Sequence, residues 1–415
     1  MKVLQKNLLL FIFSLGSIFL IINNISCSDK LKDNSPKDSN LINALQSNQY
    51  GLVYLALATS AYSDPKNIGN IVDSIKIRLK SFPQIPNPSN FAFSPSAQWN
   101  LEWGPSMAPD NSNFVFIVNY GTVDTMYFRA IVLRGTDVSS SDTGLINQLF
   151  QDFSAFQQFP WNEFLYDSLK DYNVYNRNIN ITDTSAHIAF GSAEALRKVL
   201  SLTPEFLADS GAIGSGNLIQ YLQSVEAENQ NIPLIITGHS LGGALTQAVS
   251  AFLAWQLGNA YQAGNQPVCS LIIPNAFAPP TVGDSSFVEF YDSIYPNNYY
   301  WYNVSDIAPK AYVCVDSVKV LWGAYPDSHS KSGFGASCPD WLVNTIDSLQ
   351  PLLPNYARPS NNIICFTASY LHNPDTLFIN FGAWYTQLIY QHFPHCYYTY
   401  LSKMPELAPY NPYKY

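Results

Sequence analysis

Residues 233–245 read PLIITGHSLGGAL and form a strand–turn–helix pattern. The apolar run 233–236 predicts a buried strand, and apolar residues at helical spacing over 244–255 predict a helix. Between them lies G-H-S-L-G at 238–242, an arrangement that lifts a serine to the tip of a sharp turn. The two glycines leave room where a Cβ would clash. The pattern predicts that Ser240 is a nucleophile, whereas the alternative is a glycine-rich turn that only joins strand and helix.

A serine hydroxyl needs a base to take its proton and an acid to orient that base. Enzymes with this turn place the three in the chain order serine, acid, histidine. The acid and base are therefore expected after residue 240. The helix that follows the turn offers free backbone N–H groups to a developing oxyanion, and Leu241 comes directly after the serine.

The composition favours a large globular protein that does not bind nucleic acid. The chain has 415 residues, 47% of them hydrophobic, with a formal net charge of −9 and 12% charged residues. No basic run is present, so nucleic acid is not an expected partner. The length allows more than one domain, but α/β folds often run long as one.

The first 40 residues predict export. Lys2 and Lys6 precede a mostly apolar stretch, 8–22, which is short for a membrane span and typical of a signal peptide. We place the signal peptide at 1–26, ending before Cys27, where the sequence resembles a bacterial lipoprotein cleavage site. Residues 27–40 then form a flexible polar tether. The protein is expected to be either a membrane-anchored lipoprotein with lipid on Cys27 or a secreted protein with that cysteine unmodified.

The other cysteines suggest neither zinc nor a fixed disulfide pattern. There are six cysteines and no C-x-x-C pair, so a structural zinc site is not expected. If Cys27 carries lipid, five thiols remain, and at most two disulfides can form.

Regular elements are expected on both sides of the Ser240 turn. We predict helices at 41–62, 71–79, 193–200, 218–225, 341–349 and 378–390, strands at 114–120, 126–133 and 270–273, and a loop over 83–109.

Several motifs occur in one order along the chain. The strand 126–133 ends in Arg134-Gly135-Thr136, H-I-A-F follows at 187–190, G-H-S-L-G-G at 238–243 and F-A-P-P-T-V-G-D at 277–284. This series resembles the class 3 lipase family, α/β-hydrolases that include fungal triacylglycerol lipases. The resemblance implies an α/β-hydrolase fold, with a central, mostly parallel sheet and helices on both faces. It also implies that Thr136 and Leu241 bind the oxyanion.

The resemblance also separates structural from catalytic residues. His187 corresponds to a structural histidine of the family, expected to be buried and hydrogen-bonded. Asp284 corresponds to a turn residue, and an N-cap role explains its carboxylate. Asp306, in N-V-S-D-I-A-P at 303–309, matches the strand-end motif that carries the catalytic acid.

Two histidines near the end of the chain are candidates for the base. Four histidines follow Asp306; His329 and His372 lie in predicted loops. His395 begins H-C-Y-Y, which matches the family pattern H-x-x-Y before the last helix, so His395 is our predicted base. His392 is the alternative. The two also have the spacing of a metal pair, but no third ligand is evident, and no metal or cofactor is expected.

Two insertions are expected in a domain spanning 41–415. The first, near 137–183, contains an amphipathic stretch at 144–153 where the family has its lid; the alternative is a helix fixed on the body. The second, near 310–390, is expected to shape the acyl pocket.

The predicted function is hydrolysis of lipid carboxylic esters of the acylglycerol type at an interface by Ser240, Asp306 and His395. The alternatives are an esterase or phospholipase of the same fold, or a surface-anchored binding protein on a hydrolase scaffold. The sequence leaves the acyl chain length, the head group and the oligomeric state open.

Overall fold

The strand that leads into Ser240, β6 (Leu234–His239), lies in the middle of a seven-stranded sheet. The computed structural model describes residues 39–62, 71–82, 84–88, 91–108, 113–135, 157–165, 185–226, 232–258, 271–322, 338–353, 355–369 and 383–408. The predictions for the signal peptide, Cys27, Thr136, His329, His372 and the stretch 144–153 fall outside these residues.

The strand order is β1-β2-β3-β6-β7-β9-β11. The pairs β1–β2 and β2–β3 are antiparallel, and every pair from β3 to β11 is parallel. The other strands are β1 (Gln98–Met107), β2 (Phe114–Gly121), β3 (Met126–Leu133), β7 (Ile272–Phe277), β9 (Tyr299–Asn303) and β11 (Asn362–Phe366). The predicted mostly parallel sheet is confirmed.

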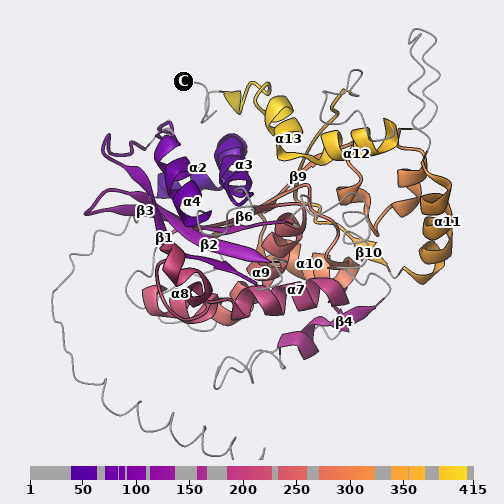
Figure 1. Cartoon of the computed structure of the whole chain (residues 1–415), viewed down its shortest axis with the longest axis horizontal. Helices are drawn as coiled ribbons and strands as arrows, with labels where there is room; N and C mark the ends of the chain where they lie inside the picture. Colours follow the sequence, from indigo (N-terminus) through magenta and orange to yellow (C-terminus); the bar gives the residue numbers. More distant parts are fainter. Residues whose placement is uncertain are drawn as a thin grey trace, which may run out of the picture. The chain divides into compact units, whose positions relative to one another are not determined.

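Side chains alternate between the two faces of this sheet, and each face is covered by helices (Figure 1). In β2, Phe114 and Phe116 join one apolar cluster, while Val115 and Ile117 join the other. The first cluster includes α2 (Ser39–Leu45), α3 (Gly51–Ser60), α4 (Ile71–Ser81) and α13 (Pro394–Leu401). The second includes α7 (Phe190–Ser201), α8 (Leu218–Glu226) and α9 (Leu241–Gly258). Helices on both faces are thus confirmed.

A smaller antiparallel sheet has the order β10-β8-β5-β4. Its strands are β4 (Gln158–Pro160), β5 (His187–Ala189), β8 (Gly283–Asp284) and β10 (Tyr356–Ala357). Three further helices are α10 (Ser285–Ile294), α11 (Asp340–Leu349) and α12 (Ala383–His392).

Three sequence predictions require correction. The expected loop 83–109 contains β1, whose pairing with β2 shifts register on either side of Trp103 and so obscures the alternation of buried and exposed residues. The segment near 310–390 is more than an insertion at the rim, because β11 pairs with β9 as an edge strand of the main sheet. The expected single helix 41–62 is two helices, α2 and α3, joined by a short 3-10 turn.

The parallel strands bring several chain segments to one edge. Leu133 of β3 pairs with Gly238, and Phe277 of β7 pairs with both His239 and Trp301. The residues that follow β3, β6 and β9 therefore meet at the carboxyl edge of the sheet, where α/β proteins place their sites. None of the helices in the described part of the chain is long and apolar enough to cross a membrane.

Candidate active site

Ser240 occupies a strained position between β6 and α9. Its φ is 60°, in the left-handed region that non-glycine residues rarely adopt. Two backbone hydrogen bonds hold this conformation: the Ser240 N–H donates to the Phe277 carbonyl at 2.9 Å, and the Gly243 N–H donates to the Ser240 carbonyl at 2.8 Å. Such strain is maintained at functional turns where the surroundings fix the backbone.

The two glycines of the turn are required by close backbone packing. A Cβ on Gly238 would overlap the Gly242 carbonyl and lie 2.7 Å from the Leu133 oxygen. A Cβ on Gly242 would overlap the Leu133 oxygen in turn. The turn therefore fits against β3 only with glycine at both positions, as the sequence predicted.

The Ser240 hydroxyl contacts His392. His392 Nε2 lies 2.8 Å from Ser240 Oγ, and His392 Nδ1 lies 2.9 and 3.0 Å from the two oxygens of Asp306. Ser240 is 5%, His392 8% and Asp306 0% exposed, so the three side chains form a continuous buried chain of contacts.

The prediction that His395 contacts Ser240 is wrong. His395 lies in the first turn of α13 and is exposed, whereas His392 is the last residue of α12 and points inward. The H-x-x-Y match chose the wrong one of two histidines three residues apart, because the chain turns a corner between them. The predicted acid Asp306 does contact the histidine that contacts Ser240, which is His392.

Asp306 is held by more than the histidine. Tyr397 donates its hydroxyl to Asp306 Oδ2 at 2.7 Å, and the Ala308 N–H donates to Oδ1 at 2.9 Å. The Tyr397 oxygen in turn accepts the Asn303 N–H at 3.0 Å. Burial and the nearby Asp306 raise the pKa of Tyr397 well above its usual value, so it remains a donor. Sequence reasoning missed Tyr397, although it lies inside the quoted stretch 395–398.

His239 links the Ser240 turn to the base. Its ring centroid is 4.9 Å from that of His392, and its carbonyl accepts the Tyr62 hydroxyl at 3.0 Å. Burial, and next the charge of His392, lower the pKa of His239 well below its usual value. His239 is therefore neutral and adds no positive charge beside the base.

The expected oxyanion donors are only partly described. Leu241 is the first residue of α9, so its N–H has no partner within the helix. Thr136 lies outside the described residues, but Gly135 immediately before it packs against the turn, since a Cβ there would lie 2.9 Å from Ser240 Cβ.

His187 and Asp284 belong to the smaller sheet, away from this cluster. His187 Nδ1 lies 3.0 Å from Asp284 Oδ2, and Asp284 Oδ1 accepts the Phe287 N–H at 2.8 Å as the N-cap of α10. The predicted capping role of Asp284 is confirmed. His187 is hydrogen-bonded as expected, but its side chain is 34% exposed rather than buried.

Among the described residues, no group of three or more His, Cys, Asp or Glu side chains could hold a metal ion. The four cysteines within the described ranges, Cys314, Cys338, Cys365 and Cys396, are free thiols.

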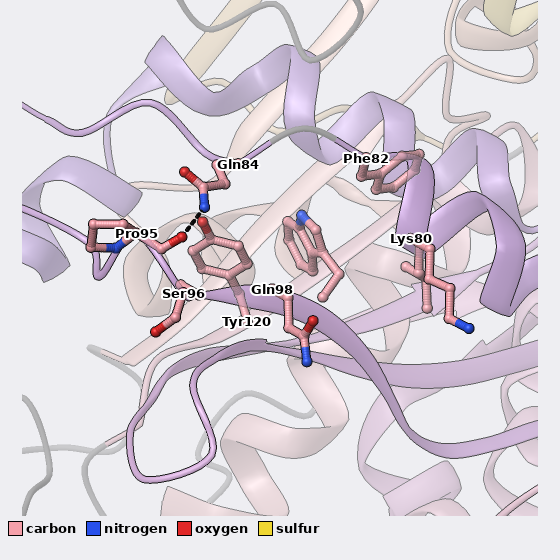
Figure 2. A pocket seen from close by; sticks show the side chains of 10 residues that line it. Lys80, Phe82, Gln84, Pro95, Ser96, Gln98 and Tyr120 are labelled. Carbon is pink, nitrogen blue, oxygen red and sulfur yellow. Dashed lines mark hydrogen bonds between the residues drawn. The ribbon is translucent and has the colours of Figure 1, made fainter.

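A separate pocket of about 370 Å³ opens between the end of α4, residues 95–99 and β2 (Figure 2). Aromatic side chains, among them Phe82 and Tyr120, line it beside the exposed Lys80 and Gln98. The Gln84 amide already donates to the Pro95 carbonyl across it. None of the lining residues belongs to the Ser240 cluster, and the pocket lacks a paired nucleophile and base.

The sheet order, the turn with Ser240 at its tip, and the contact of Ser240 with His392 define the chain as a protein of the α/β-hydrolase fold. The crystal structure of M37 lipase is similar over 87% of this chain and 94% of that one, at 17% identity and a TM-score of 0.60. Nonglycosylated LIP2 lipase of Yarrowia lipolytica shares 13% identity over 63% of this chain and 73% of its own, with a TM-score of 0.37. The lipase of Rhizopus microsporus var. chinensis shares 14% over 66% and 69%, with a TM-score of 0.34.

Residues 130–316 match the family described as Lipase (class 3). The matched segment runs from β3 past Asp306, so this part of the chain is similar to the class 3 lipase family, and the shared fold agrees with that similarity. At the level of the family, the function is that of a lipase-type ester hydrolase. No match was found among curated proteins.

Proposed function

We propose that this protein hydrolyses carboxylic esters of lipids, of the acylglycerol type, through Ser240, His392 and Asp306. The observation that carries the proposal is the buried chain of contacts from Ser240 Oγ to His392 Nε2, at 2.8 Å, and from His392 Nδ1 to Asp306, at 2.9 Å. This is the arrangement of nucleophile, base and orienting acid that acyl transfer from an ester needs.

In the first step, Ser240 Oγ attacks the ester carbonyl carbon while His392 Nε2 takes the hydroxyl proton. Asp306 accepts from Nδ1, which fixes the tautomer and stabilises the imidazolium that forms. The N–H groups of Leu241 and Thr136 would bind the developing oxyanion. His392 then gives its proton to the leaving alcohol, and the acyl group remains on Ser240.

In the second step, water attacks the acyl-enzyme with His392 again acting as base, and the fatty acid leaves. This chemistry uses no metal ion or cofactor. Residues 144–153 remain candidates for a lid over the site, and export with lipid on Cys27 remains the predicted location. The mass of the mature N-terminal peptide decides between lipid anchoring and simple secretion.

The test is covalent labelling and turnover in Ser240→Ala. A fluorophosphonate probe should label the wild-type protein and not this variant, and turnover of a lipid ester should fall by about 10⁴ to 10⁶. Ser293→Ala is the matched control, because that exposed serine on α10 donates only to the neighbouring Phe290 carbonyl. Labelling that persists in Ser240→Ala would refute the assignment.

A further inference from the structure

Two cations, Lys310 near the proposed catalytic acid and Arg358 after β10, make no ion pair with a carboxylate among the described residues. Lys310 follows Asp306 by four residues, is only 8% exposed, and its ammonium makes no hydrogen bond or ion pair in the described part of the chain. Arg358 follows β10. Its guanidinium lies 5.3 Å over the Tyr302 ring, and its Nη1 is buried with no hydrogen-bond partner in that part of the chain.

Both residues contact Cys314, Lys310 through its backbone carbonyl and Arg358 through its guanidinium. The Cys314 N–H donates to the Lys310 carbonyl at 3.1 Å, which places both residues on one turn of chain. Arg358 Nη2 lies 3.7 Å from Cys314 Sγ. We call Lys310, Cys314, Arg358 and Tyr302 the 310/358 cluster. Burial lowers the pKa of Lys310; Cys314 opposes this effect, Arg358 adds to it, and Asp306 opposes it.

Lys310 is buried and Arg358 is partly buried, and neither makes an ion pair with a carboxylate in the described part of the chain. Removing a charge from water is unfavourable unless the charge is paired, and an arginine cannot avoid that cost by losing its proton. A bound anion would pair both groups at once. Arg358, Cys314 and Tyr302 are each partly exposed, so an anion can reach the cluster from the surface of the described residues.

A phosphate group fits this pair of donors. A guanidinium and an ammonium are the side chains that proteins use to bind phosphate, and its several oxygens can reach two cations at different angles. Asp306, the described carboxylate whose charge acts on Lys310, already contacts His392, Tyr397 and the Ala308 N–H. It is therefore less able to repel an anion than an unpaired carboxylate would be.

We propose that the 310/358 cluster is a phosphate-binding site beside the active site. The phosphate comes either from the head group of a glycerophospholipid substrate or from free inorganic phosphate. Only the head-group source rests on the proposed lipid-ester hydrolysis, whereas phosphate binding itself does not.

The binding test uses full-length Ser240→Ala protein, so that it does not depend on catalysis. Inorganic phosphate is titrated calorimetrically at constant ionic strength into this protein and into the same protein carrying Lys310→Met or Arg358→Met. We expect each added substitution to weaken phosphate binding by about tenfold or more. Lys319→Met is the matched control and should leave binding unchanged, since Lys319 pairs with Asp316 and Asp347 instead.

The source is tested on catalytically intact protein by comparing kcat/KM for a phosphatidylglycerol and a triacylglycerol of equal acyl length in the same detergent micelles. A fall of about tenfold or more in the phospholipid-to-triacylglycerol ratio, in Lys310→Met and not in Lys319→Met, supports the head group as the source. An unchanged ratio with lost phosphate binding supports free phosphate.

Lys310→Arg and Arg358→Lys guard against misfolding, because they keep the charge and should retain most phosphate binding. The proposal is overturned if wild-type phosphate binding is absent, if the methionine variants bind as well as the parent, or if acetate binds as tightly as phosphate. If the wild-type protein binds phosphate but hydrolyses no ester, only the proposed function is refuted.

Discussion

The nucleophile turn and the corner between α12 and α13 are built in different ways. The turn needs only residues 238–243, because its two glycines, its serine and its helix start are consecutive. At the corner, α12 ends at His392, Phe393 caps α13 with extended backbone, and Pro394 begins the next helix (Figure 1). Residues three apart would share a face of one helix, but here the break sends His392 inward and leaves His395 exposed.

Contacts distant in sequence hold the corner in place. Asn303, at the end of β9, donates its side-chain amide to Gln391 at 2.7 Å and its backbone N–H to Tyr397 at 3.0 Å. The end of one strand thus contacts the chain on both sides of His392. A local motif can place the nucleophile, whereas the position of the base depends on tertiary packing.

Replacing each of the two histidines with alanine is the strongest test of this comparison. His392→Ala should lower kcat by about 10⁴ to 10⁶, as expected when the general base of a triad is removed. His395→Ala should leave kcat within about twofold, because that side chain is exposed and has no contact with Ser240. Steady-state kinetics on one ester measures both. A large loss in His395→Ala with activity retained in His392→Ala would restore the sequence-based prediction.

The second prediction tests the rigidity of the turn. In Gly238→Ala, the new Cβ overlaps the Gly242 carbonyl, and backbone atoms cannot rotate away as side chains do. We expect a loss of about 3 kcal/mol or more in the free energy of unfolding, the upper range for overpacking, with activity falling as Ser240 is displaced. Urea denaturation measures the stability.

Gly211→Ala is the control for that variant. The nearest atom to its Cβ is 3.6 Å away, so only the left-handed φ of 85° opposes alanine. Its cost should be about 1 kcal/mol. Equal losses in the two variants would show that backbone overlap at the turn is not the cause.

Tyr397→Phe tests the support of the acid with a smaller change. It removes the donor to Asp306 Oδ2 and leaves the Asn303 N–H without its acceptor. A hydrogen bond to a charged group contributes about 1.5–3 kcal/mol, so kcat should fall by about tenfold or more. KM should stay near the wild-type value, since the tyrosine is fully buried and its hydroxyl is bonded to Asp306.

Tyr400→Phe is the matched control on the same helix, because the Tyr400 hydroxyl accepts from Ser369 rather than serving the acid. If both variants lose kcat in proportion to their melting temperatures, Tyr397 is only structural.

Much of the fold could be predicted from local patterns. β2, β3 and α9 have clear periodicity, and the Ser240 turn is a contiguous motif. The two missed strands of the main sheet have causes in their own sequences. β1 contains Gly104-Pro105 and shifts register, while β11 is an edge strand with alternating exposed positions. Neither presents the uniform apolar run of a central strand.

The site was predictable to the extent that its residues lie within motifs. Ser240 and Asp306 both contact His392, and each follows a core strand within a recognisable stretch. The contacting histidine was not predicted, since both candidates precede tyrosines and only the break at Phe393 distinguishes them. The proximity of Lys310 and Arg358 to Cys314 could not be predicted from sequence, because Arg358 comes 48 positions after Lys310.

His239, in the nucleophile turn, lies against His392 at the corner. Its titration should have the smallest effect of those predicted, a change in stability with pH. Its pKa in the folded protein lies well below 6.5, whereas the unfolded chain takes up that proton near pH 6.5. The stability that the neutral imidazole contributes is therefore present above pH 6.5 and is lost as the pH falls. The loss should begin near pH 6.5 and grow steadily as the pH falls further.

The measurement is the free energy of unfolding between pH 7.5 and 5 in the wild type and in His239→Gln. The glutamine that replaces His239 does not titrate in this range. The wild-type curve should fall more steeply than that of the variant, while carboxylates common to both cancel in the difference. Parallel curves would mean that His239 accepts a proton in the folded state. The ring 4.9 Å from His392 would then carry a charge opposing the imidazolium that catalysis requires, and the two regions would work against each other rather than together.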